Sequence, residues 1–446
     1  MQERCPEGGV ASAGVPVGRA RLPQLAHFGR SKPASVAEGA AVPGPMHYPA
    51  FRRALAGRTV STAGSWMQTV AAGWLIYDLT RSASAVAVLT VFSRGPGMLL
   101  STYGGELADR YDRRRLCIAG FVVQAVVAAV LAGLVWDGIS RVTEVYAATL
   151  VIGVAGALVN PSVQLLVNAT VPRELAKRAA GLGSVSYNTA RLVGPAVGGG
   201  LVAGIGPGPC FAINAVSYLA VILMVAALPH GTGAPVRTRT RLRTAVSRVR
   251  IDPLIRDLIL SAVLFSVLVA PVQELAPAIA RRHGEGAHLL GFLLSALAVG
   301  GLVGNLVRSA LDKRGLASTK ALGASMLVCA LALLGVAATT EYVVVLVAMV
   351  GCGMAWDVLY VVSLTGVQFA DARLAGVMTG LFFTSTLAGV TVGALLVGGL
   401  FDALGVGGGL VACAAGVAVC GIWAWTRRPD AQPLAAGGAS AASDRR

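Results

Sequence analysis

The sequence predicts an all-α, polytopic membrane protein whose twelve transmembrane helices form two pseudo-symmetric six-helix halves. Hydrophobic residues make up 55% of the 446 residues, charged residues make up 13%, and the mean hydropathy is +0.70. A water-soluble fold could not bury that much apolar surface. The apolar residues gather in about twelve runs of roughly 20 to 27 residues, and each run is long enough to cross a bilayer of about 30 Å. A central polar stretch separates six runs from six.

The runs set the expected division of the chain. Their limits are roughly 55–77, 84–107, 116–136, 145–168, 179–205 and 209–228, then 254–280, 287–309, 319–339, 342–368, 374–400 and 406–426. We expect a disordered extension, an amino-terminal half, a linker, a carboxy-terminal half and a disordered tail at 1–50, 51–228, 229–253, 254–428 and 429–446. Met46 is an alternative start, just before a basic flank.

Lysine and arginine predict the orientation. If both termini lie on one side, 24 of the flanking Lys and Arg residues fall on that side and 4 on the other. Because cytoplasmic loops carry the excess, both termini and the linker at 229–253 are expected in the cytoplasm of a cell with the protein in its plasma (inner) membrane. Two interpretations of the linker arginines remain open, a solvated segment and a site for anionic lipid headgroups.

The densest charge lies at 104–116, between the second and third spans. Such a patch must lie outside the hydrocarbon, so it predicts a tight cytoplasmic turn. Its pattern, Gly-x-Leu-Ala-Asp-Arg-x-x-Arg-Arg, closely resembles the signature loop of the major facilitator superfamily of secondary transporters. That resemblance assigns a gating motif to Gly105, Leu107, Asp109, Arg110, Arg113 and Arg114. Asp112 departs from the motif's usual glycine.

The resemblance implies a role for this turn. Asp109 would pair with Arg113 and meet the amino-terminal end of helix 11, which would close the inner gate. The alternative is a charge cluster that only sets topology. A weaker copy at 311–315, with Asp312 in the place of Asp109, supports two parallel halves built by duplication.

A second motif lies in the fifth span, at 188–200. Pro195 removes a backbone donor and bends a helix, while small residues four apart allow a neighbouring helix to approach closely. The motif residues are Arg191, Gly194, Pro195, Gly198 and Gly199. They resemble an exporter motif of the superfamily. Together with 65–68 and 74–80 they resemble the branch that includes the enterobactin exporter and macrolide-efflux-like permeases. A packing kink without directional meaning is the alternative.

Ionisable residues inside a membrane are costly, so each is a functional candidate. Four lie inside predicted spans: Arg94, Arg191, Glu274 and Asp357. Asp357 is about 15 residues, or roughly 22 Å, into its helix and therefore near mid-membrane. It is a candidate for proton coupling, and the alternative is a static pair with Arg94 or Arg191. Glu274 is expected near the outer surface, where water solvates it.

The fourth span carries polar residues four apart, at Asn160, Gln164 and Asn168. This spacing places them on one helical face, which is expected to contact either substrate or water. We therefore include Asn160 and Gln164, with Arg94 and Asp357, in the candidate proton-coupling or substrate site.

Enzyme functions are not predicted. No lysine follows a glycine, so a phosphate-binding loop is absent from the sequence, and no pair of its seven cysteines has Cys-x-x-Cys spacing. We expect a secondary transporter without cofactor or metal, monomeric in the bilayer, with protons and a small molecule as its partners and no nucleic acid. Proton-driven efflux of an amphipathic siderophore, antibiotic or drug-like compound is the first hypothesis. Import of a small solute and a transport-inactive sensor or scaffold are the alternatives.

Overall fold

The computed structural model describes residues 44–139, 141–228, 249, 252–284, 286–313, 319–370 and 375–426. The chain divides into two units, Met1–Pro43 and Gly44–Arg446, and all described residues belong to the second. Most of the expected extension at 1–50, most of the linker at 229–253 and the tail at 429–446 lie outside the described residues. Within the described ranges every regular element is a helix, as the predicted all-α class requires.

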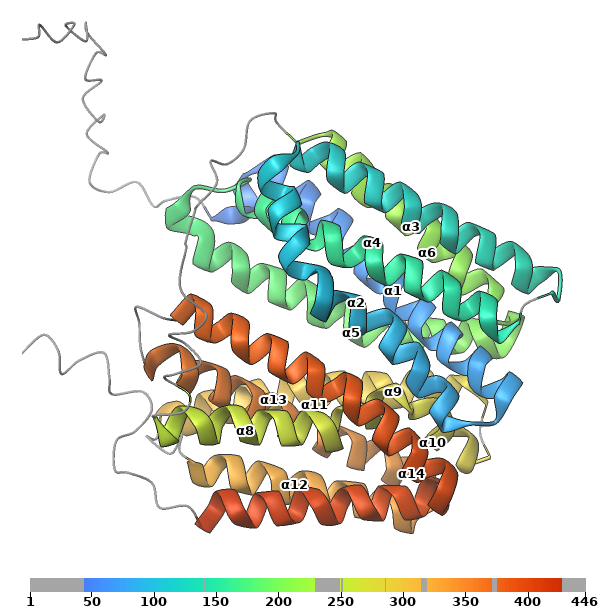
Figure 1. The fold of residues 1–446 in the computed structure, drawn as a ribbon, viewed down its shortest axis with the longest axis vertical. Helices are drawn as coiled ribbons and strands as arrows, with labels where there is room; N and C mark the ends of the chain where they lie inside the picture. Colours follow the sequence, from blue (N-terminus) through green and yellow to red (C-terminus); the bar gives the residue numbers. More distant parts are fainter. Residues whose placement is uncertain are drawn as a thin grey trace, which may run out of the picture. The chain divides into compact units, whose positions relative to one another are not determined.

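The first half contains six long helices (Figure 1). They are α1 (Pro49–Thr80), α2 (Ala83–Arg110), α3 (Arg113–Trp136), α4 (Val142–Asn168), α5 (Ala176–Ile205) and α6 (Gly208–Ala226). Each begins and ends within two turns of the expected span. Side chains cap the start of two of them. Ser82 accepts a bond from the amide of Ala85 and begins α2, and Asp112, which replaces the motif's usual glycine, accepts bonds from the amides of Arg114 and Arg115 and begins α3.

The second half differs from the expected pattern in its first span. Its helices are α8 (Pro253–Leu268), α9 (Ala270–Glu274), α10 (Ala276–Arg282), α11 (Ala287–Lys313), α12 (Thr319–Ala338), α13 (Tyr342–Ala370) and α14 (Ala375–Thr426). The span predicted at 254–280 is present but is divided into three helices, because the helix is interrupted at Val269 and Leu275. Pro271 and Pro277 lack the amide donors that a continuous helix needs and explain both breaks.

The helices form twelve segments when α8–α10 count as one and α14 as two. Gly405, with φ 71° and ψ 162°, is the point at which α14 turns back. Nine helices within the described residues are long and apolar enough to cross a membrane. The observed architecture is therefore that of a polytopic helical membrane protein.

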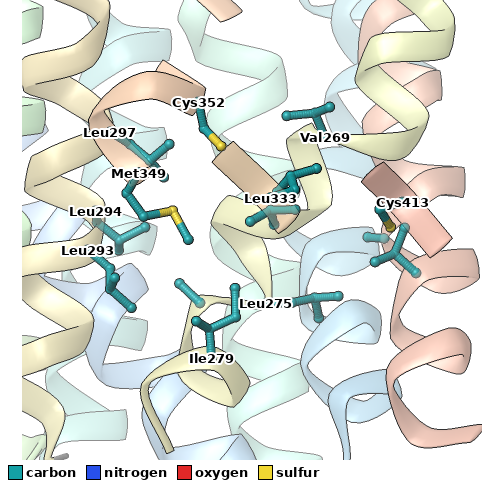
Figure 2. Packing of buried hydrophobic residues seen from close by; sticks show 14 of the residues in the cluster. Val269, Leu275, Ile279, Leu293, Leu294, Leu297, Leu333, Met349, Cys352 and Cys413 are labelled. Carbon is teal, nitrogen blue, oxygen red and sulfur yellow. The ribbon is translucent and has the colours of Figure 1, made fainter. Parts of the chain in front are cut away.

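The second half has a tightly packed apolar interior. Figure 2 shows Leu294 and Leu297 of α11 beside Met349 and Cys352 of α13, with side chains of α12 and α14 completing the cluster. Glycine allows the close approach of α11 and α13, since a Cβ atom at Gly353 would overlap the carbonyl oxygen of Leu297.

The two halves meet through α5 against α11 and through α2 against α14. We call the end of the bundle that carries the α1–α2 connection and Asp402 the closed end. There the Asp402 carboxylate accepts hydrogen bonds from Ser82 Oγ (2.8 Å) and from the amides of Ala83 (2.7 Å) and Ser84 (3.0 Å). Asp402 therefore caps a helix of the other half.

A second contact also joins the halves at the closed end. Asp78 of α1 forms an ion pair with Arg281 of α10, and the Arg281 guanidinium lies 4.3 Å from the ring centre of Trp74. Further hydrogen bonds and ion pairs between the halves lie between this end and the middle of the helices.

Candidate functional site

A cavity of about 630 Å³ lies inside the first half. Helices α1 to α6 supply nearly all of its wall, and Glu274 and Leu387 are the contributions of the second half. The wall is rich in hydroxyl and amide groups, among them Ser61, Thr62, Ser65, Gln68, Thr90, Ser93, Thr149, Asn160, Gln164 and Asn214. Its volume lies in the range of small-molecule sites.

Arg94 and Glu274 form an ion pair between the halves on this wall. Arg94 Nη2 donates to Glu274 Oε1 over 2.6 Å, and the side chains are 35% and 9% exposed. Glu274 is the last residue of α9, so the break between α9 and α10 positions it. The expectation that water solvates Glu274 near the surface is therefore wrong. The prolines at 271 and 277 were the sequence signal for this broken helix.

Arg191 makes the neighbouring contact between the halves. Its Nη2 donates to Gln273 Oε1 over 2.7 Å, and its guanidinium carbon lies 5.9 Å from the ring centre of Trp66. Gln273 and Glu274 are adjacent on α9, so this short helix accepts hydrogen bonds from one arginine of α5 and one arginine of α2. Sequence reasoning selected both arginines but missed Gln273.

Two of the three residues of the polar face predicted on α4 lie on the cavity wall, and Asn168 is not among the lining residues. Asn160 and Gln164 both line the cavity, and Gln164 Oε1 accepts a hydrogen bond from Arg58 Nη1 over 2.9 Å. On another part of the wall, Asn214 Nδ2 donates to Gln68 Oε1 over 2.6 Å. The Asn214–Gln68 pair is buried, whereas the Gln164 side chain is exposed, so the buried pair is the one that fixes the arrangement of the wall.

Asp357 does not line the cavity. It lies in the middle of α13, against Gly304 of α11, where a Cβ atom at Gly304 would be 2.9 Å from the Asp357 Cβ. Its polar neighbours are the Asn305 amide and the guanidinium groups of Arg308 and Arg191. Arg94, one of the two expected partners, instead pairs with Glu274. The structure thus separates Asp357 from Arg94, Asn160 and Gln164.

The charged turn lies at the end of the bundle opposite the closed end. Gly105, Leu107 and Arg110 belong to the last turns of α2, and Arg113 Nε donates to the Ala108 carbonyl over 3.0 Å. The Asp109 side chain is outside the described residues, so its expected pairing with Arg113 stays a prediction. The side chains of Asp312 and Lys313 are also outside them.

Arg114 of the same turn reaches the end of α6. Its Nη1 donates to the Leu228 carbonyl over 3.5 Å, and its Nη2 donates to the Ala226 carbonyl. An arginine at the carboxyl end of a helix satisfies carbonyl groups that lack helical partners. The motif therefore fastens two helices of the first half together.

The glycine motif of α5 packs on both sides of the helix. A Cβ atom at Gly194 would lie 2.8 Å from the Trp66 Cβ, and one at Gly198 would lie 3.0 Å from the Met67 Cα, so both glycines admit α1. Gly199 faces α11 of the other half, where a Cβ atom would be 2.7 Å from the Ala287 carbonyl oxygen. Helix α5 continues through Pro195.

The fold matches solved transporters of low sequence identity. The nucleoside transporter NupG superposes with a TM-score of 0.67 at 11% identity, over 84% of this chain and 98% of NupG. A bacterial homologue of the human lysosomal transporter Spinster, in an inward-facing and unoccupied conformation, gives 0.66 at 13% identity, over 86% and 97%. These similarities establish the fold alone.

Sequence comparisons place the chain more narrowly. The multidrug efflux pump Tap of Mycobacterium tuberculosis (strain ATCC 25618 / H37Rv) is 25% identical over 81% of this chain and 90% of Tap. The enterobactin exporter EntS of Escherichia coli O1:K1 / APEC is 26% identical over 79% of this chain and 85% of EntS. The profile of the transmembrane secretion effectors matches residues 40–434. This chain therefore belongs to the transmembrane secretion effector family of major facilitator superfamily transporters.

Proposed function

We propose that this transporter exports a small amphipathic compound by alternating access, driven by the proton gradient. The observation that carries the proposal is the ion pair of Arg94 and Glu274, which joins the halves on the wall of a polar cavity. A transporter that alternates must make and break contacts of this kind between its halves. A carboxylate that can take up a proton offers a way to control one.

The arrangement of contacts supports a specific conformation. The halves are joined from the closed end to mid-helix by Asp402, Arg281, Glu274 and Gln273. We assign the closed end to the outer face and both termini to the cytoplasm of a cell with this chain in its plasma (inner) membrane, as the Lys and Arg distribution predicts. The cavity then belongs to a state that is closed to the outside.

We base the proposed proton coupling on Glu274 and its ion pair with Arg94. With Glu274 ionised, the ion pair with Arg94 holds the halves together, and Arg191 and its Gln273 contact reinforce the same region. When the closed end opens, water reaches the carboxylate and a proton from outside neutralises it. The closed end can then close again over the neutral side chain, because an uncharged carboxyl group costs little to remove from water. The proton leaves towards the cytoplasm when Glu274 pairs with Arg94 again.

The direction of transport is supported by the relatives. Tap is named as a multidrug efflux pump and EntS as an enterobactin exporter. Import is the second candidate, since the same fold also serves a nucleoside transporter and an outward cycle can in principle be reversed.

The test compares the small-molecule content of cells that lack the protein, carry it, or carry Glu274→Gln. A compound that accumulates inside the cells without the protein and in those with Glu274→Gln establishes export and dependence on this carboxylate. A compound that is depleted inside such cells would instead establish import. An unchanged content of all compounds in the Glu274→Gln cells would remove Glu274 from the mechanism.

A further inference from the structure

We infer that the cavity selects an amphipathic organic anion, which is attracted by Arg58 and Arg94 on the cavity wall. The inference rests on the proposed export function and adds the chemical class of the substrate. The inference is based on the charges of the cavity wall. These charges belong to α1, α2 and α5, which are separate in the sequence and come together only in the fold.

The wall carries an excess of positive charge. Arg58 and Arg94 line the cavity, and Glu274 is the one carboxylate among its described lining residues. Arg191 lies behind the wall, over the ring of Trp66. Tyr187 of α5 lines the same cavity. Guanidinium groups stay charged at any physiological pH, so an entering anion is attracted and a cation is repelled.

Both lining arginines have donors left for a ligand. Arg58 Nη1 donates to the neutral amide oxygen of Gln164, and no carboxylate pairs with Arg58 among the described residues. Arg94 gives Nη2 to Glu274, and its Nε has no hydrogen-bond partner within the described part of the chain but is buried, so a ligand reaches it only if the side chain moves. A guanidinium carries five N–H donors and binds carboxylate oxygens in pairs. The remaining donors of Arg58 therefore favour a ligand that carries hydrogen-bond acceptors.

The aromatic residues of the cavity wall indicate the chemistry of the rest of the ligand, beyond its acidic group. The rings of Trp66, Phe121 and Tyr187 line the same cavity as the hydroxyl groups. Aromatic walls favour flat apolar ligands, and 630 Å³ accommodates a compound of several fused rings. The expected substrate therefore combines a carboxylate or phenolate with an aromatic body.

The anion also explains how a substrate could release the closed end. When an acidic group takes the Arg94 guanidinium, Glu274 loses its counterion in a buried position. The carboxylate regains hydration only if the halves separate there. Substrate binding would thus favour opening to the outside, which is the step that export needs.

The test uses two probes of matched shape, pyrenebutanoate and pyrenebutyltrimethylammonium, with purified full-length protein in lipid nanodiscs. Binding is followed by the fluorescence of the pyrene. We expect the anion to bind at least about tenfold more tightly than the cation, Arg94→Gln to weaken the anion at least about tenfold, and Arg58→Gln to weaken it about threefold to tenfold. Arg53→Gln, on the exposed face of α1 outside the cavity, is the matched control and should leave binding unchanged.

Arg58→Gln keeps the test valid if Arg94→Gln does not fold, because Arg58 makes no ion pair with a described residue. Equal or tighter binding of the cation, no binding of either probe, or full anion binding by Arg58→Gln would each overturn the assignment. Proteoliposomes separate this result from the proposed function. Anion binding without outward transport would contradict export but leave the anion site intact. Outward transport of the cation alone would support export but contradict the anion site.

Discussion

The first half of the molecule surrounds a polar cavity beside an apolar core of its own, whereas the interior of the second half is a tightly packed apolar core. In the first half, amides and hydroxyl groups of all six helices line about 630 Å³ of space. In the second half, glycines bring α11 and α13 into contact, and Leu297, Met349 and Cys352 fill the interior. The difference indicates that the first half supplies the binding surface and that the second half supplies a firm body carrying Glu274 into it.

Of the substitutions that test this difference between the halves, Arg94→Gln should have the largest effect on transport. Removing one partner of a buried ion pair leaves Glu274 unpaired and costs about 3–5 kcal/mol of the closed conformation. Transport should fall by at least about a hundredfold. The double variant Arg94→Gln, Glu274→Gln should regain thermal stability but not proton-dependent transport. Equal stability of the single and double variants would show that the pair is not coupled.

Gly353→Val should affect folding of the second half without altering the cavity. A side chain at this position overlaps the backbone of Leu297, so overpacking should cost about 1–3 kcal/mol and lower the Tm. Gly301→Val is the matched control on α11, because nothing lies within 4 Å of the Cβ position there. If both variants unfold at the same temperature, close packing of α11 and α13 is not what stabilises this half.

Asp402→Asn should weaken the closed end by about 1 kcal/mol, the usual contribution of a helix cap. The substitution keeps the shape of the side chain and removes its charge from the amino terminus of α2. Asp252→Asn is the control, since Asp252 caps α8 within its own half through the amides of Leu254 and Ile255. Only Asp402→Asn should increase the accessibility of the closed end to a water-soluble thiol reagent at a cysteine placed at position 79.

Asp357→Asn should have the smallest effect. Asp357 packs between α11 and α13 and does not line the cavity, so its loss should change transport by less than about threefold. Proton dependence should remain. Transport by Asp357→Asn that no longer responds to pH would transfer the coupling role from Glu274 to Asp357.

The helices were predictable because apolar runs of membrane length have few alternatives. The spans from α1 to α6 agree with the structure, and the glycines at 194 and 198 face a neighbouring helix as their spacing indicates. Arg94, Asn160 and Gln164 also lie on the cavity wall as candidates for a polar site.

The position of Glu274 was not predictable from a count of apolar residues. Its depth depends on the two breaks that divide α8 from α9 and α9 from α10, and hydropathy does not record backbone direction. The position of Asp357 along its helix was predicted correctly, but the sequence did not show that Asp357 packs against α11. Contacts between halves, such as Arg191 with Gln273, join residues 82 positions apart and appear only in the fold.

The most direct test of the account is the distance between the halves at the closed end with and without the charge of Glu274. Spin labels at Leu79→Cys and Leu404→Cys, both exposed, report it after Cys5 and Cys420 are replaced. Double electron–electron resonance should give one short distance for the labelled protein that keeps Glu274. Glu274→Gln should add a longer distance, because it removes the ion pair with Arg94 that joins the halves. Identical distance distributions with and without Glu274→Gln would contradict the role of the Arg94–Glu274 pair.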